Sequence, residues 1–194
     1  GKSNIFLEYK PILSLKDNTV DRFEALASMQ SDKLGRIAPL EFISLAEKMQ
    51  LIVPIGLQIM RKACNFLRRL QLSGYSKTTV GVNVSAIQFF RAEFVDDIIK
   101  IINETEVDAS RVCIEITESI FLGNYEEINA KLASLQKIGI KVSIDDFGVG
   151  YSSLAREGEL NIDYLKIDKL FVDKLLRVTP DKAIAGDIIA IAHR

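Results

Sequence analysis

Short runs rich in β-branched residues alternate along the chain with longer segments of helical periodicity. Six runs predict strands: Ile5–Ile12, Val20–Ser28, Thr79–Ser85, Val112–Thr117, Lys141–Asp145 and Tyr164–Ile167. Apolar residues recur at helical spacing in five other segments: from Pro39, from Pro54 to Ser73-Gly74, Phe94–Glu106, Tyr125–Ile138 and Asp181–His193. This alternation predicts an α/β fold of parallel βα units, either a TIM-like barrel or an open doubly wound sheet.

Each predicted strand has one apolar face and one polar face. Side chains alternate across a strand, so Val80 and Val82 point one way while Gly81 and Asn83 point the other. Parallel strands are normally apolar on both faces, because helices cover both. A closed barrel with its polar residues facing the interior explains the difference. An antiparallel sheet with one solvated face is the alternative, and the helices between the strands argue against it.

Composition limits the classes of partner. The 194 residues are 48% hydrophobic and 26% charged, with a formal net charge of −1, so no broad attraction to nucleic-acid polymers or anionic membranes is expected. Two cysteines, Cys64 and Cys113, are too few for a disulfide framework or a zinc site, and reduced thiols fit a cytoplasmic protein. No apolar run is long enough to span a bilayer, so no membrane contact by this domain is expected.

The polar faces carry a set of oxygen ligands towards the ends of successive strands: Glu24, Asn83, Glu115 and Asp145, with Asp146 alongside and Lys166 and Asp168 beyond. In (β/α)₈ enzymes the carboxyl ends of the strands form the active site. Carboxylates meeting there repel each other unless a cation offsets them. Hard oxygen ligands suit Mg²⁺ or Mn²⁺, and four or five of them can hold two metals for phosphodiester hydrolysis. Lys166 would then act as a point charge on water or phosphate.

Five motifs occur in a fixed order: Glu24-Ala25-Leu26, Asn83-Val84-Ser85 with Gln88-Phe89, Glu115-Ile116-Thr117-Glu118, Asp145-Asp146-Phe147-Gly148 and Lys166-Ile167-Asp168. In these motifs the chain resembles the EAL-domain family of bacterial cyclic-di-GMP phosphodiesterases. The resemblance implies a modified TIM barrel that hydrolyses one phosphodiester of cyclic di-GMP to give linear pGpG, using Mg²⁺ or Mn²⁺. It also implies cyclic di-GMP as ligand, a homodimer, and fusion to upstream sensory or GGDEF-type domains.

The resemblance also assigns roles to individual residues. Glu24, Asn83, Glu115 and Asp145 would ligate a first metal, and Asp145 with Asp146 a second. Lys166 would position the attacking water, and Glu118 would hold the loop Asp146–Leu154 in place. The residues expected to bind substrate are Leu26, Lys10 and Asp168.

Three departures from the family pattern bear on activity. Lys10 stands where the family has Gln, and Ser28 stands where it has an Arg that contacts the ligand phosphate. The chain ends at Arg194, so we expect a single EAL domain over residues 1–194, cut before its last two βα units, with about six of eight strands and impaired or absent activity. The alternative function is a degenerate EAL domain that acts as a cyclic-di-GMP receptor or interaction module without catalysis.

Overall fold

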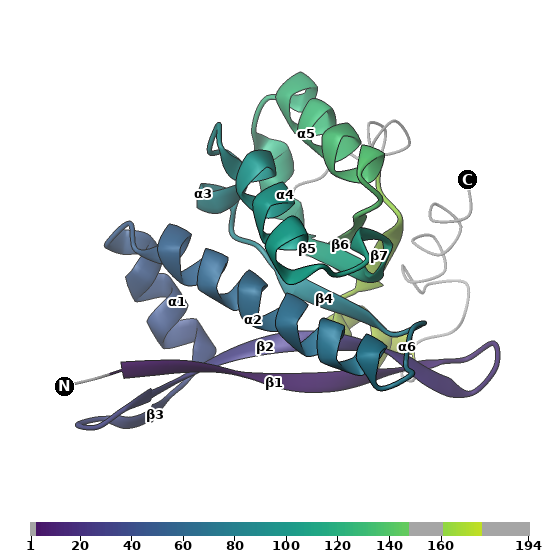
Figure 1. Cartoon of the computed structure of the whole chain (residues 1–194). Helices are drawn as coiled ribbons and strands as arrows, with labels where there is room; N and C mark the ends of the chain where they lie inside the picture. The colour runs from purple at the N-terminus through teal and green to yellow at the C-terminus, as the bar shows by residue number, and fades with distance from the viewer. Residues whose placement is uncertain (1–2, 148–160, 176–194) are drawn as a thin grey trace.

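A mixed β-sheet with helices packed along its outer face organises the chain (Figure 1). The computed structural model describes residues 3–147 and 161–175. The strands are β1 (Ser3–Ser14), β2 (Thr19–Ser31), β3 (Gly35–Ile37), β4 (Thr79–Asn83), β5 (Val112–Thr117), β6 (Lys141–Phe147) and β7 (Tyr164–Ile167). The α-helices are α1 (Pro39–Lys48), α2 (Ile52–Leu72), α3 (Ala86–Phe89), α4 (Phe94–Thr105), α5 (Tyr125–Lys137) and α6 (Lys169–Leu175), and the 3₁₀ turns are η1 (Ala109–Arg111) and η2 (Glu118–Leu122).

The strands follow the order β1-β2-β4-β5-β6-β7, and β3 pairs with β2. β2, β4, β5, β6 and β7 are parallel, so their carboxyl ends lie at the same edge of the sheet. All six predicted strands are present. The short β3 was not predicted, because three residues carry no readable periodicity.

The first two strands depart from the expected parallel βα pattern. β1 and β2 form an antiparallel hairpin, with Lys10 opposite Glu24 and Phe6 opposite Ser28. Only residues 15–18 separate the two strands, and a parallel connection needs a crossover of a dozen or more residues. Asn18, at φ 57, closes the turn by donating its N–H to the carbonyl of Ser14 at 2.9 Å. The parallel part of the sheet therefore begins at β2.

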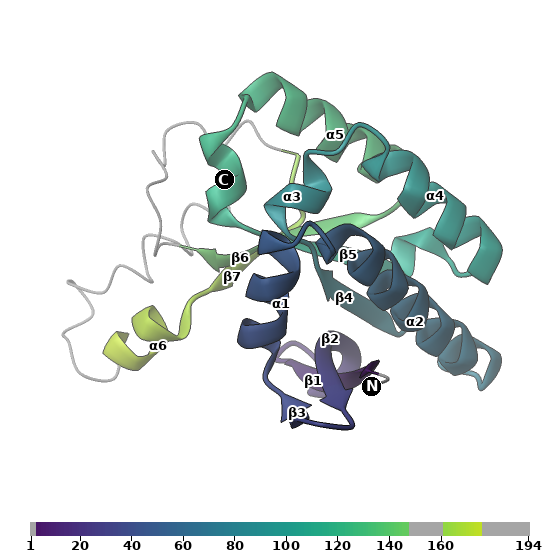
Figure 2. The ribbon, with the colours of Figure 1, turned by 90° about the vertical axis from the view of Figure 1, so that its left-hand side faces the viewer.

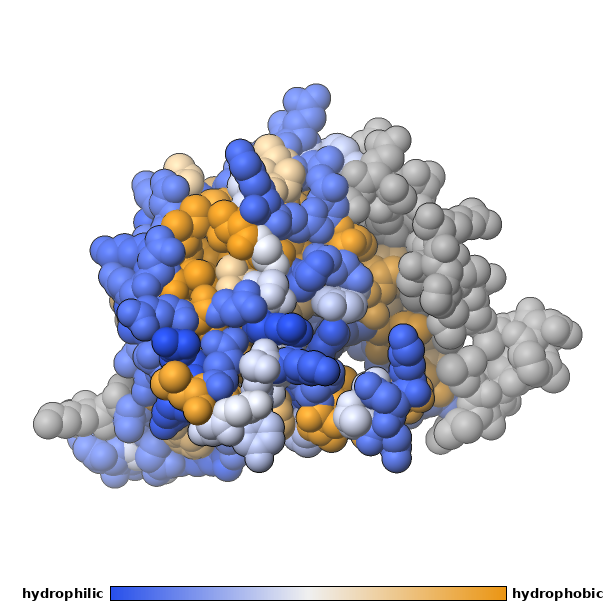
Figure 3. Space-filling model, turned by 45° about the vertical axis from the view of Figure 1, so that its right-hand side comes forward, coloured by the Kyte–Doolittle hydropathy of each residue, from blue (hydrophilic) through white to orange (hydrophobic). Residues whose placement is uncertain are grey.

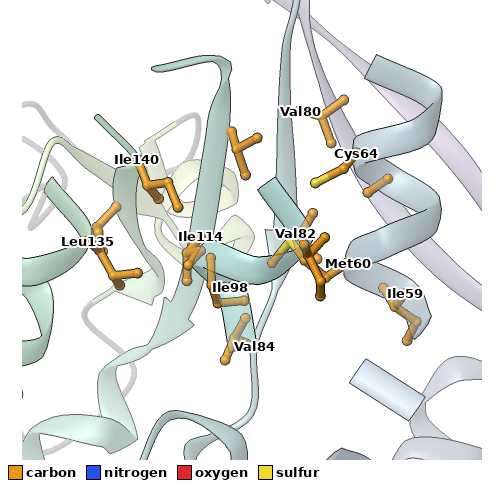
Figure 4. Packing of buried hydrophobic residues seen from close by; sticks show 14 of the residues in the cluster. Ile59, Met60, Cys64, Val80, Val82, Val84, Ile98, Ile114, Leu135 and Ile140 are labelled. Atoms are coloured by element: carbon orange, nitrogen blue, oxygen red, sulfur yellow. The ribbon is translucent and has the colours of Figure 1, made fainter. Parts of the chain in front are cut away.

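The hydrophobic core lies between the sheet and helices α2, α4 and α5, which cover the same face (Figures 1 and 2). Figure 4 shows Val80 and Val82 of β4 and Ile114 of β5 packed with Met60 of α2 and Ile98 of α4. Val80 and Val82 are the residues that the alternation pattern assigned to the apolar face of this strand. The opposite face is thus left to the polar side chains.

Several element boundaries differ from the sequence expectations. α2 begins at Ile52, so Pro54 lies within its first turn and does not open the helix. Ser85, expected at the end of a strand, is the N-cap of α3 and forms a reciprocal capping box with Gln88. The predicted helix Asp181–His193 lies outside the described residues. Cys64 and Cys113 are free and buried, as expected.

On the face seen in Figure 3, hydrophilic residues predominate and the hydrophobic surface is broken into separate areas. A mixed surface of this kind is ordinary for a globular domain. None of the helices in the described part of the chain combines the length and the apolar character that a bilayer crossing requires.

Candidate metal centre

Three carboxylates converge at the carboxyl edge of the parallel strands. Glu24 of β2, Glu115 of β5 and Asp145 of β6 each offer one oxygen, and these oxygens all lie within 4.8 Å of one another. Glu24 and Glu115 are buried, and Asp145 is partly buried. Two oxygens on opposite sides of a divalent cation, at ~2.1–2.4 Å each, are ~4.2–4.8 Å apart. The donor set and its spread therefore fit a hard divalent cation.

Lys166 of β7 reaches into the middle of this cluster. Its Nζ donates to Glu115 Oε2 at 2.7 Å and to Asp145 Oδ2 at 2.8 Å, and it lies 3.5 Å from Glu24 Oε2. With all three carboxylates ionised, one ammonium leaves a formal charge of −2 in a largely buried site. This residual charge is what a divalent cation would offset.

Burial and charge pull the pKa values of this cluster in definite directions. Burial raises the pKa of Glu115 above its ordinary value, although the Lys166 ammonium acts to lower it. Burial acts to lower the pKa of Lys166, but Glu115 and Asp145 outweigh it, and the pKa is raised. Lys166 is therefore fully protonated at neutral pH and behaves as a fixed positive charge.

Asn83 and Asp146 lie at the margin of the cluster. Asn83, at the end of β4, donates from Nδ2 to Glu24 Oε1 at 3.1 Å, so its amide is in contact with one of the converging carboxylates. Asp146 is exposed and has a left-handed backbone with φ 53, a conformation that is uncommon outside Gly and that Asp and Asn adopt more often than most other residues. Burial, then Asp145 and Asp168, raise the pKa of Asp146. Crowding of acidic groups thus continues beyond the three converging carboxylates.

Gly81 is a site residue that the sequence reasoning missed. It faces the cluster from β4, beside Glu24 in the strand register. A Cβ added at Gly81 would lie 2.2 Å from Glu115 Oε1, a distance at which the carboxylate would have to move. The missing side chain is what lets Glu115 lie across β4, and only the cross-strand register reveals it.

The residues expected to bind substrate are less closely gathered. Lys10 is exposed, faces Glu24 across the hairpin, and forms no ion pair within the described ranges. Leu26 follows Glu24 on the same face of β2 and is partly buried. Asp168 lies just beyond β7, where its Oδ1 accepts the N–H of Leu170 at 2.6 Å and supports the start of α6.

Glu118 is buried and opens η2 directly after β5. The loop that it is expected to hold, Asp146–Leu154, is described only through Phe147. The part from Gly148 onward lies outside the described residues, so the role of Glu118 stays a prediction.

A largely parallel sheet with helices on its outer face defines a domain of the (β/α)-barrel class, and the acidic cluster at its carboxyl edge could hold a metal ion. A family model for the EAL domain matches residues 2–194. The chain belongs to the EAL-domain family.

Two proteins of Pseudomonas aeruginosa are among the similar curated sequences. The cyclic di-GMP phosphodiesterase NbdA is 36% identical over 188 residues, which cover 97% of this chain and 24% of that protein. MucR, a bifunctional diguanylate cyclase and cyclic di-GMP phosphodiesterase, is 33% identical over 192 residues, which cover 99% of this chain and 28% of that protein. The chain thus spans about a quarter of the length of each.

Solved structures show the same architecture. The MucR phosphodiesterase in complex with c-di-GMP superimposes with a TM-score of 0.90 at 33% identity, covering 97% of this chain and 76% of that one. The EAL domain of DcpA from Mycobacterium smegmatis gives a TM-score of 0.77 at 30% identity, covering 96% and 74%. The predicted fold class, an α/β TIM-like barrel, is confirmed, and the matches cover about three quarters of each solved chain.

Proposed function

We propose that the chain is a metal-dependent phosphodiesterase that hydrolyses cyclic di-GMP to linear pGpG. The observation that carries the proposal is the convergence of Glu24, Glu115 and Asp145 within 4.8 Å at the carboxyl edge of an EAL-family sheet. The similar proteins NbdA and MucR, which are named cyclic di-GMP phosphodiesterases, support the substrate class.

The residues of this chain divide the work by position. Glu24, Glu115 and Asp145 would hold Mg²⁺ or Mn²⁺, with Asn83 beside Glu24 and Asp146 available to a second ion. When bound, the metal lowers the pKa of a coordinated water and stabilises negative charge on the phosphodiester. Lys166, held between Glu115 and Asp145, keeps its proton and orients the water or a phosphate oxygen through its N–H donors.

The reaction is a hydrolysis, so no oxidant or second substrate is needed. The water oxygen bonds to phosphorus, and one P–O bond to a ribose oxygen breaks. One proton of the water ends on that ribose oxygen as a hydroxyl, and the ring opens to a linear dinucleotide. Asp145 and Asp146 are more exposed than Glu24 and Glu115, so they are the carboxylates of the site that lie nearest to solvent.

The proposal is tested by incubating a longer form of the protein, one that continues past residue 194, with cyclic di-GMP and Mn²⁺ and separating the products by chromatography. We expect pGpG as the single product, and its loss in Asp145→Asn. Ser134→Ala, on the outer helix α5, is the matched control and should leave turnover unchanged. If the longer form releases no pGpG at any Mn²⁺ concentration, the protein is not a phosphodiesterase.

A receptor function without catalysis is the second candidate, and Ser28 is the observation that favours it. Its hydroxyl is buried, with 1% of the residue exposed, so it cannot contact a ligand at the mouth of the site. Cyclic di-GMP binding without pGpG formation would establish this alternative.

The wider assembly also belongs to the proposal. A homodimer, a cytoplasmic location and fusion to upstream sensory or GGDEF-type domains remain predictions, and the bifunctional MucR supports the fusion. Light scattering of the purified chain tests the dimer directly: a single species at the monomer mass across the micromolar range would contradict it.

A further inference from the structure

The hairpin extends the polar face of the site beyond the acidic cluster. β2 continues past the end of β4, and Ser28 lies four residues, or ~13 Å, along the same face from Glu24. Residues directly opposite in an antiparallel pair share a face. Because Glu8 pairs with Leu26 and Arg36 pairs with Gln30, both project from the same face as Glu24 and Ser28.

Glu8, Ser28 and Arg36 form one polar network, which lies further along β2 than the acidic cluster. Ser28 Oγ donates to Glu8 Oε2 at 3.2 Å, and Arg36 Nη2 donates to Ser28 Oγ at 3.3 Å. Arg36 Nη2 also forms an ion pair with Glu8. The Arg36 guanidinium lies over the Phe6 ring, 5.7 Å from its centre, which is within cation–π distance.

Arg36 is anchored by one edge and open on the other. Each of its polar contacts to the described residues is made by Nη2, which leaves Nη1 and Nε for an outside acceptor. Its side chain is 58% exposed, whereas Ser28 is buried. A planar guanidinium with two free donors in a fixed fork is the group that best matches a phosphate.

The other cations on this face are less well placed. Arg22 lies towards the opposite end of β2, where its guanidinium is 4.0 Å from the centre of the Tyr164 ring. Lys10 is level with Glu24, beside the acidic cluster itself. Among the described cations of β1, β2 and β3 on this face, Arg36 is therefore the one that stands apart from the carboxylates of the metal centre and towards the end of β2.

We propose that Arg36 binds the phosphodiester of a cyclic dinucleotide that the acidic cluster does not engage. The inference rests on the proposed function, because a cyclic dinucleotide carries two phosphodiesters and the metal centre acts on one. Glu8 holds the guanidinium over Ser28 and competes with the phosphate for it. Arg36 thus supplies from β3 the cation that β2 lacks at Ser28.

The test measures the affinity for cyclic di-GMP by titration calorimetry in EDTA, where hydrolysis is stopped. Arg36→Ala should weaken binding roughly 10- to 100-fold, the usual effect of removing a charge-assisted contact. Glu8→Gln breaks the same ion pair but should tighten binding, because it removes the competing carboxylate. Opposite effects from the two ends of one ion pair distinguish ligand binding from a structural role, which would make both variants weaker.

Two further arms complete the experiment. Arg61→Ala removes an exposed arginine that pairs with Glu104 on the outer helices, and it should leave the affinity unchanged. Ser28→Arg should restore binding in the Arg36→Ala background, because the two side chains meet at 3.3 Å. Equal affinity of wild type and Arg36→Ala overturns the assignment of Arg36 alone. No binding by the wild type overturns the cyclic-dinucleotide ligand itself.

Discussion

Lys166 Nζ lies 2.7 Å from Glu115 Oε2, the more deeply buried of the two carboxylates to which it donates. An ammonium at this distance stabilises the ionised carboxylate, and it also places a positive charge where a metal would share the same oxygens. The predictions for the site follow from this double effect.

Replacing Lys166 by Met should tighten Mn²⁺ binding. The ammonium lies within 3.5 Å of all three converging carboxylates, so it repels a divalent cation and competes for its ligands. The same variant should lose hydrolysis, because the donor to water or phosphate is gone. Titration calorimetry measures the first effect and product chromatography the second. Weaker Mn²⁺ binding in Lys166→Met would contradict the competition.

Replacing Asn83 by Ala should weaken Mn²⁺ binding with little effect on folding. Asn83 is exposed and donates a hydrogen bond to Glu24, so among the described residues its loss leaves only one carboxylate oxygen of Glu24 without that partner. Glu115→Gln should weaken binding more strongly, because it removes a ligand charge. Unchanged Mn²⁺ affinity in both variants, measured by calorimetry, would remove the two residues from the metal site.

Replacing Gly81 by Ala should cost about 1–3 kcal/mol of unfolding free energy and also weaken Mn²⁺ binding. The new methyl group would overlap Glu115 Oε1 and push the carboxylate from the cluster. Val82→Ala is the control. Val82 is the next residue along β4 and faces the core, so this variant should lose about 2 kcal/mol of unfolding free energy without changing the metal affinity. Urea denaturation and calorimetry separate the two effects, and equal metal affinities in both variants would count against the role of Gly81.

Asp163 makes stability depend on acid pH. It accepts hydrogen bonds from Val142 N at 2.9 Å and Lys141 Nζ at 2.8 Å, just before β7. Burial acts to raise the pKa of Asp163, but these hydrogen bonds outweigh it and the pKa is lowered. A lowered pKa means that the stabilisation is present above the unfolded-state pKa of about 3.9 and is lost as the pH falls through the lower folded-state value.

Asp163→Asn should therefore be less stable than wild type by about 1–3 kcal/mol at pH 7, with the difference shrinking below about pH 4. Urea denaturation at pH 7 and below about pH 4 measures this difference in unfolding free energy. Asp173→Asn, which removes an exposed carboxylate paired with Lys169, should change stability little at either pH. A constant difference between wild type and Asp163→Asn at all pH values would refute the linkage.

The strand alternation was enough to bring the acidic residues together. A period of two placed Glu24, Glu115 and Asp145 on one face, and parallel strands put their ends at one edge, so the cluster could be expected from the sequence. The position of the Lys166 ammonium could not. A side chain with four rotatable bonds can reach several partners from the same strand position, and sequence does not select among them.

Features that depend on pairing between distant segments were out of reach of the sequence. In the sequence, Gly81 is only a residue with a weak preference for strands. Its role becomes visible when β5 lies beside β4, because the Glu115 side chain occupies the space that a side chain at Gly81 would fill. Arg36 lies in a strand of three residues, too short for a periodic pattern, and gains its meaning from pairing with β2. The antiparallel hairpin, by contrast, could have been inferred from its short connection.

Glu24 and Ser28 lie on one uninterrupted strand, β2, so the strand fixes the distance between them. Faces alternate with every residue, so the gap between the acidic cluster and the Arg36 network can change only in steps of two residues, or ~6.6 Å. Inserting one residue between Glu24 and Ser28 would turn the far end outward and separate the two parts of the site. The pleat of β2 therefore allows only certain spacings between the acidic cluster and the Arg36 network, and so only certain lengths of ligand can contact both.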